Sequence, residues 1–414
     1  MQAAAAAGKS ALDRYFPGLW LAAFFFLVVT RAVNTAPDVA LTVLGLLGAV
    51  YCAAFRREPW RRLFAEHALI LVPALALALA ILWSQSVMVR HGGLPGVVPA
   101  QAPLLICLPV LAIFLANPGN FQAVVGLFAA LCVWHFFSMP LEAVTGFKLT
   151  WHPVELIARE AWPFRYQASG LAVQSYTFVG LFLPMFYLAW GPLVHKRAFP
   201  QWRLPVSIMA ILPLLWLIPV ATVQSRSALA GAFLAGILAF VSIQRGLRPA
   251  GWLLLIGCAV VAIWFYLYLF AQGKTGPELR IAYLKLYLRE SLDWHWLATG
   301  RGYPYGVDPP PVVPGLTPLA HSHNDIVQVF FSWGLPGLVA YLAFWAGLLR
   351  LVGRRFVARG EHWPALALVA VVPNLITDVG FHFFEKAAFL VILAAMCMAC
   401  AGPPREPAPA GQMG

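Results

Sequence analysis

The chain has 414 residues, of which 61% are hydrophobic and only 11% charged, with 28 lysine and arginine residues against 16 acidic ones. Its mean hydropathy of +0.77 excludes an ordinary soluble domain, in which only about half of the residues are apolar. The net charge of +12 does not indicate a nucleic-acid partner, because the basic residues stand in short clusters between apolar runs. The six cysteines fall inside such runs and predict no disulfide framework.

Uncharged apolar runs recur along the whole chain and are long enough to cross a hydrocarbon core of about 30 Å as helices. They predict an all-α polytopic membrane protein with about twelve transmembrane helices. The first span is expected to remain as an anchor, because no convincing cleavage site follows it. The expected spans lie near residues 16–33, 37–55, 67–84, 103–117, 121–138, 170–190, 205–222, 227–243, 251–270, 325–349, 363–380 and 384–401.

Basic clusters set the orientation of the predicted spans. They occur at 56–62, 195–203, 244–248 and 350–359, which are all on the side of the N-terminus. Lysine and arginine are retained in short cytoplasmic loops, so both termini are expected to be cytoplasmic. The alanine-rich start and the tail are expected to be disordered ends.

The same orientation divides the chain into four parts. Residues 1–270 carry nine spans and an outward loop at about 139–169, and residues 271–324 form a large, partly helical outward loop between spans nine and ten. Residues 325–401 carry the last three spans, and residues 402–414 form the cytoplasmic tail. Chemistry is expected on the outward face.

The loop 271–324 begins with an amphipathic helix. Thr275 and Glu278 have the spacing of a capping box, and an apolar row follows at helical spacing. One interpretation is a helix lying on the membrane interface, with its apolar side in lipid or against the bundle. The apolar row consists of Ile281, Leu284, Leu288 and Leu292. Arg280 lies in the first turn, where a helix N-terminus and a guanidinium together favour a phosphate group.

The same loop ends in a glycine pair and a histidine cluster. Gly300 and Gly302 permit close backbone approach, although this G-x-G lacks the strand and helix of a dinucleotide site. In "HSHN", His321 and His323 have a spacing compatible with a metal, but no cysteine or acidic pair accompanies them. A second reading makes this stretch a helix cap, with Asn324 capping the next span. In a third reading, His323 is a general base or hydrogen-bonds the substrate.

The histidine cluster leads directly into the span 325–349. Gly334 and Gly337 lie one turn apart in it and predict close helix packing. Arg165 and Arg226 are expected on the same outward side as Arg280. Each arginine is also compatible with a cation that snorkels to the interface. Cations with a histidine base suggest transfer from a preactivated lipid phosphate, because a pyrophosphate leaving group needs neutralising and an incoming hydroxyl needs a base.

These residues resemble a known signature. His323-Asn324, then "DIVQVFFSW", then Gly334 and Gly337, is similar to the pattern of the bacterial O-antigen ligase and O-antigen polymerase superfamily. "SRSAL" around Arg226, "GRG" at 300–302 and the layout of about twelve spans with one large periplasmic loop extend the resemblance. Motif-level similarity runs from residue 221 to about 380.

The resemblance implies a metal-independent inverting glycosyltransferase of the bacterial inner membrane that needs no cofactor. Its donor would be undecaprenyl-pyrophosphate-linked O-antigen and its acceptor lipid A–core, at the periplasmic face among membrane lipids. His323 would activate the acceptor hydroxyl, and Arg226 and Arg280 would bind the pyrophosphate. The predicted site also includes Arg165, Asn324, Gly300, Gly302 and His321. The sequence does not indicate an oligomeric state.

Three alternatives remain at this point. An O-antigen polymerase and a protein O-oligosaccharyltransferase share the motif, and the intact histidine-to-glycine pattern and short tail favour the ligase. A lipid-linked glycan transporter would be expected to show ionisable residues within its spans or broken helices. Charges instead stand almost wholly at predicted span ends, and Glu385 and Lys386 are expected at the outer edge of the last span.

Overall fold

The structure is a computed structural model that describes residues 2–33, 38–90, 99, 101–147, 166–168, 178–199, 201, 205–223, 225–245, 276–302, 322, 324–377 and 384–401. The regular elements of these residues are all helices, which confirms the predicted all-α class for this part of the chain. The expected ninth span at 251–270, most of the loop 139–169 and the tail 402–414 lie outside the described residues.

The first five helices follow the expected spans but differ at their ends. They are α1 (Gln2–Val33), α2 (Asp38–Phe55), α3 (Arg57–Arg90), α4 (Gln101–Leu115) and α5 (Pro118–Thr145). The expectation of a disordered alanine-rich start is wrong, because these residues begin α1, and alanine has the highest helix propensity. The basic cluster 56–62 extends into the first turns of α3 instead of forming a loop.

The middle of the chain is interrupted by prolines. A π-helix, η1 (Phe178–Phe182), leads into α7 (Leu183–Val194), and α8 (Val206–Leu215), α9 (Leu217–Thr222) and α10 (Arg226–Arg245) follow. The expected single span 205–222 is divided between α8 and α9 at Trp216. Pro219 has no N–H to donate to the carbonyl of Leu215, so the regular hydrogen-bond pattern breaks there.

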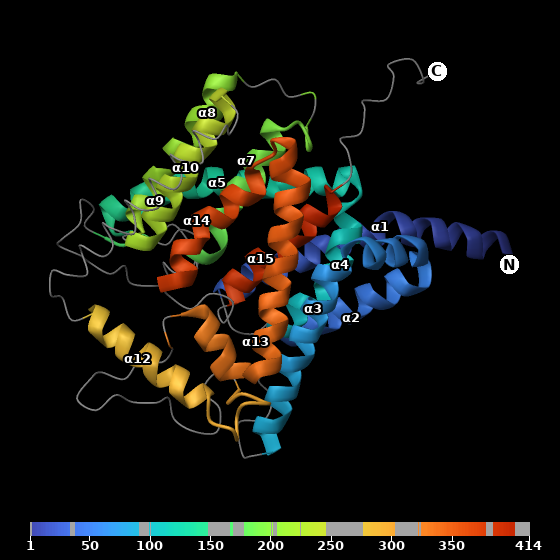
Figure 1. The fold of residues 1–414 in the computed structure, drawn as a ribbon. Helices are drawn as coiled ribbons and strands as arrows, with labels where there is room; N and C mark the ends of the chain where they lie inside the picture. The colour runs from blue at the N-terminus through green and yellow to red at the C-terminus, as the bar shows by residue number, and fades with distance from the viewer. Residues whose placement is uncertain are drawn as a thin grey trace.

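The last helices lie in and around the centre of the bundle. They are α12 (Gly276–Ser291), α13 (Asp325–Leu351), η2 (Val352–Phe356), η3 (Val357–Arg359), α14 (Trp363–Thr377) and α15 (Phe384–Ala399). Every side chain from Lys386 to Met398 is buried. Figure 1 shows α15 in the middle of the helices, while α12 lies at the end of the molecule opposite α8.

Glycines bring several pairs of helices close together. A Cβ on Gly231 of α10 would overlap the carbonyl of Ala370 in α14, and one on Gly347 of α13 would overlap the carbonyl of Leu69 in α3. Small residues allow helix backbones to approach in this way within a membrane. The close contact of α13 with α3 is therefore made at Gly347.

Among the described residues, three helical runs are long and apolar enough to cross a membrane by length and composition: Arg57–Arg90, Pro118–Thr145 and Asp325–Arg359. Shorter apolar helices accompany them. The outer faces of the long helices carry exposed large apolar side chains, which a soluble surface rarely gathers in such number. Examples are Leu79, Phe137 and Val339. The described part of the chain thus fits a helical membrane protein, and the number of twelve spans stays a prediction.

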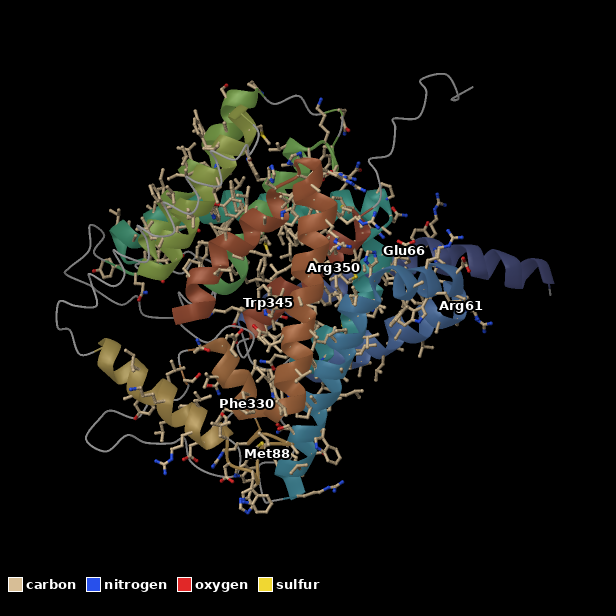
Figure 2. The ribbon with its side chains drawn as sticks, in the orientation of Figure 1. Arg61, Glu66, Met88, Phe330, Trp345 and Arg350 are labelled. Carbon is tan, nitrogen blue, oxygen red and sulfur yellow. The ribbon has the colours of Figure 1, made fainter. Side chains whose placement is uncertain are left out.

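The two ends of the bundle differ in character. Figure 2 shows Met88 and Phe330 toward the lower end of the molecule, and Arg61, Glu66 and Arg350 away from them. At the basic end, Arg197 and Glu361 form a largely buried ion pair that joins the turn after α7 to the start of α14. Arg61 and Arg350, which come from the basic clusters 56–62 and 350–359, therefore both lie away from Met88 and Phe330.

One charged side chain is buried although it stands at the start of its helix. Lys386 was expected at the outer edge of the last span, but its side chain is only 1% exposed. A Cβ on Gly180 of η1 would lie 2.8 Å from Cγ of Lys386, so the lysine packs against the π-helix. Lys386 is in the first turn of α15, as the span boundary predicts, and the tertiary packing buries it.

Candidate functional site

The described structure includes only part of the predicted site. Arg165, His321 and His323 lie outside the described residues. Arg226 is the first residue of α10 and Arg280 lies near the start of α12, and only their backbones are described. The candidate site is therefore built from the elements that hold these residues.

Asn324 caps α13, as the sequence predicts. Its extended backbone, with φ −149° and ψ 127°, precedes the helix, and its side-chain Oδ1 accepts a hydrogen bond from the backbone N–H of Val327 at 3.1 Å. The cap satisfies one of the N–H groups that the first turn of a helix leaves without a helical partner. The residue that follows His323 is thus fixed in place by the start of α13.

α13 is not the straight span that the sequence predicts, because it breaks at Gly334. This glycine has φ 65° and ψ −168°, a left-handed conformation that side-chain-bearing residues rarely adopt. The break separates a half-helix, residues 325–333, from a long half, residues 335–351. The predicted close packing is present at Gly337, which packs mainly against Trp333 of the half-helix, whereas Gly334 approaches the backbone of residues 297–300 instead of a helix.

A hydrogen bond shows that the half-helix folds back along the long half. The hydroxyl of Tyr341 donates to Oδ2 of Asp325. In a continuous α-helix these residues would lie about 24 Å apart along the axis, so no side-chain contact would form. Figure 1 shows the two parts of α13 side by side in orange.

A turn in the loop before α13 fits into this break. Residues 297–302, here called the docking turn, make three backbone hydrogen bonds to α13. Arg301 N–H donates to the carbonyl of Phe331 at 2.8 Å, and Gly302 N–H donates to that of Ser332 at 2.8 Å. In the other direction, Leu335 N–H donates to the carbonyl of Leu297 at 2.8 Å. The docking turn therefore satisfies backbone groups that the break would leave without helical partners.

Gly300 and Gly302 provide the close approach that the sequence predicts, and their partner is the protein itself. Both have positive φ, 67° and 77°. A Cβ on Gly300 would overlap the backbone of residues 332–334, and one on Gly302 would overlap the side chain of Met88 in α3. In the structure these glycines pack the docking turn against α13 and α3. Their predicted contact with substrate remains a prediction.

Arg301, between the two glycines, is a residue that the sequence analysis missed. Its Nη2 pairs with Glu290 of α12 at 2.6 Å, and its guanidinium lies over the rings of Trp296 and Phe331 at 5.4 and 5.8 Å. The side chain is only 12% exposed. Arg301 thus connects α12, the docking turn and the half-helix. No periodic pattern in the sequence pairs it with Glu290.

A chain of polar side chains follows the half-helix. Ser322 N–H donates to Gln328 Oε1 at 2.9 Å, and Gln328 Nε2 donates to Ser332 Oγ at 3.2 Å. The carbonyl of Ser332 also accepts a bond from Ser84 Oγ at 2.9 Å. All four residues are buried. Buried polar groups of this kind fix a single arrangement when they are satisfied.

α12 packs on the half-helix by a face other than the predicted apolar row. Tyr283 and Tyr287 are fully buried, and the ring of Tyr287 meets that of Phe331 at 4.6 Å. Ile281, Leu288 and Leu292 are 42–62% exposed. These three residues of the row are therefore not packed on the bundle, whereas Leu284 is half-buried, and contact of the row with lipid stays a prediction.

An acidic residue, Asp293, follows shortly after the end of α12 at Ser291. Asp293 accepts a hydrogen bond from the His295 side chain at 2.9 Å and another from its backbone N–H at 3.1 Å. These bonds lower the pKa of the Asp293 carboxyl. Because Arg301 already pairs with Glu290 and lies 4.0 Å from Asp293, its charge is largely balanced by acids. Arg301 is a structural cation, unlike the roles predicted for Arg226 and Arg280.

Comparison with known proteins adds no assignment: no protein-family model matches the chain, and no curated protein matches it either.

Proposed function

We propose that this chain is an O-antigen ligase, which transfers undecaprenyl-pyrophosphate-linked O-antigen polysaccharide to lipid A–core and so forms lipopolysaccharide. One observation carries the proposal. Two separate pieces of the resembling pattern, "GRG" at 300–302 and the stretch that ends at Gly334, are hydrogen-bonded to each other. Two stretches that resembled the pattern only by chance would not be expected to contact each other, whereas two parts of one site would.

In the proposed reaction, His323 takes the proton of the acceptor hydroxyl. The hydroxyl oxygen forms a bond to the anomeric carbon of the donor, and the bond from that carbon to the pyrophosphate oxygen breaks. Undecaprenyl pyrophosphate leaves with the electron pair, and Arg226 and Arg280 neutralise its charge. A single displacement inverts the configuration of the anomeric carbon.

The places of the two arginines in the fold support their proposed role. Arg226 begins α10 and Arg280 lies near the start of α12. The first N–H groups of a helix lack helical partners and, with the helix dipole, favour anions. Both arginines are thus carried by helix ends suited to a pyrophosphate.

The distribution of charge supports the proposed sidedness. The docking turn meets α13 and Met88 at the end of α3 that is remote from the basic cluster 56–62. If the basic end is cytoplasmic, the half-helix and α12 face the periplasm, where the proposed donor and acceptor would meet. The membrane, its type and the sidedness belong to this proposal.

A second candidate, a lipid-linked glycan transporter, gains support from one feature. Discontinuous helices with buried polar ends are typical of transporter binding sites, and α13 is broken while Asp325 and Lys386 are buried in first turns. Both charges stand at helix starts, as the sequence predicts, so only the break in α13 weakens the argument against this class. The resemblance around His323 still favours transfer over transport.

Deletion of the gene distinguishes these functions by the species that accumulates. A ligase deletion is expected to leave long polymer on undecaprenyl pyrophosphate at the periplasmic face, with unmodified lipid A–core. Single repeat units on the carrier would indicate a polymerase, loss of glycosylated protein would indicate a protein transferase, and glycan retained at the cytoplasmic face would indicate a transporter. Any of these three outcomes would overturn the ligase proposal.

A further inference from the structure

The bond between Tyr341 and Asp325 joins the first turn of the half-helix to the long half of α13. Both side chains are buried, at 2% and 3% exposed. Asp325 is two residues after His323 and adjacent to the cap Asn324. The bond therefore acts on the turn that immediately follows the proposed base.

We propose that Tyr341 is a positioning residue that clamps the first turn of the half-helix and thereby sets the location of residue 323. The part concerning residue 323 rests on the proposed function, and the clamp itself does not. Tyr341 acts through Asp325, so it is not a catalytic residue.

The geometry of the half-helix explains why a clamp matters at this place. Its far end is held beside Gly334 by the docking turn, through the carbonyls of Phe331 and Ser332. From there the half-helix extends for about 13 Å. A change of about 10° at the break would move the first turn by roughly 2 Å, and a misplacement of about 1 Å can lower a rate 100-fold.

Several other polar contacts near the first turn are internal to that part of the chain. Ser322 bonds to Gln328 and Asn324, and Asn324 bonds to Val327. These bonds stiffen the start of the half-helix but leave its angle to the long half unchanged. The Tyr341 hydroxyl lies across the break, so it restrains that angle.

Asp325, which accepts this hydrogen bond, stands where a helix favours a carboxylate. Asp325 is the first residue of α13, where the helix dipole favours negative charge. An asparagine at this position would keep an oxygen that accepts from Tyr341, whereas an alanine would not. Asp325→Asn is therefore the conservative variant, and Asp325→Ala removes the bond from the other side.

The test combines hydrogen exchange with kinetics on the full chain in detergent or nanodiscs. In Tyr341→Phe, amides of residues 326–329 are expected to exchange at least about fivefold faster, with residues 337–351 unchanged. Asp325→Ala should reproduce this effect and Asp325→Asn should show little of it. Tyr187→Phe is the matched control, because Tyr187 is also fully buried and donates to the carbonyl of Ala232 at 3.3 Å on other helices.

The kinetic readout separates positioning from general weakening. With undecaprenyl-pyrophosphate-linked glycan as donor, Tyr341→Phe is expected to lower kcat by about 10- to 100-fold and to change the donor KM by less than about twofold. Tyr187→Phe should leave kcat near the wild-type value.

The outcomes are distinguishable. Unchanged exchange at 326–329 in both Tyr341→Phe and Asp325→Ala would overturn the clamp, whatever the activity. Faster exchange with unchanged kcat would overturn the positioning of residue 323. If wild-type protein transfers no glycan but its variants show the expected exchange, the proposed function fails and the clamp stands.

Discussion

Gly300 and Gly334 meet backbone to backbone, each with a left-handed φ, where the docking turn fits into the break of α13. A Cβ on Gly334 would lie 2.7 Å from the backbone nitrogen of Gly300. Neither position has room for a side chain, and neither backbone conformation favours one. This contact joins the loop before α13 to the helix that begins after His323.

Replacement of Gly300 by alanine should therefore be costly for two reasons. The left-handed conformation costs about 1–2 kcal/mol for a residue with a Cβ, and overpacking costs about 1–3 kcal/mol more. Gly360→Ala is the matched control, because Gly360 has φ 76° but open space around its Cβ position. Thermal unfolding in detergent should show a clearly larger loss for Gly300→Ala. Equal losses would mean that the close contact contributes nothing.

The Arg301–Glu290 pair should stabilise the docking of α12. We expect a double-mutant cycle with Arg301→Gln and Glu290→Gln to give a coupling of about 1–3 kcal/mol, because the arginine is largely buried. The exposed pair Arg62–Glu58, at 2.8 Å and 71% and 64% exposed, should give only about 0.3–0.5 kcal/mol. A coupling at Arg301 no larger than this control would contradict its role as a connector.

The cap of α13 should affect activity as well as stability. Asn324→Ala is expected to lower the free energy of unfolding by about 1 kcal/mol, and Asn324→Asp should keep the cap. Asn117 caps α5 through its Oδ1, which accepts from Gly119 N–H at 2.9 Å. Asn117→Ala should thus cost a similar amount of stability. Glycan transfer should fall only in Asn324→Ala, and a parallel fall in both variants would assign Asn324 a structural role alone.

Donor binding should depend on the shape of the arginine side chain. Arg226→Lys keeps the charge but loses the planar fork that binds phosphate oxygens in pairs. We expect the donor to bind about 10-fold more weakly, the equivalent of about 1.4 kcal/mol. Arg289→Lys is the control, since Arg289 is exposed on α12. Unchanged donor affinity in Arg226→Lys, measured by titration, would indicate that Arg226 does not bind the donor.

The sequence predicted those features that depend on local pattern. Apolar runs predicted the positions of most helices, because a segment long enough to cross the hydrocarbon core is recognised from its own residues alone. The cap at Asn324 followed from the side chain alone. The basic clusters 56–62 and 350–359 were assigned to one side of the membrane, and that sidedness stays a prediction.

Features that depend on tertiary contacts were missed. Gly334 has the same small side chain whether a helix packs closely or breaks, so the sequence did not distinguish the two. The pairing of Arg301 with Glu290 has no helical spacing to reveal it. In α12 the leucine row was the obvious apolar face, yet Tyr283 and Tyr287 are buried. The spacing of apolar residues shows which face of a helix is apolar, but not whether that face contacts lipid or protein.

The central claim is that His323, two residues before the half-helix in the sequence, is the base for glycan transfer, and one reconstituted reaction tests it. Purified wild-type, His323→Ala and His321→Ala proteins would receive undecaprenyl-pyrophosphate-linked glycan and lipid A–core in nanodiscs. We expect His323→Ala to transfer at least about 100-fold more slowly with unchanged thermal unfolding, and His321→Ala to retain most activity. Transfer by folded His323→Ala at the wild-type rate would contradict the claim.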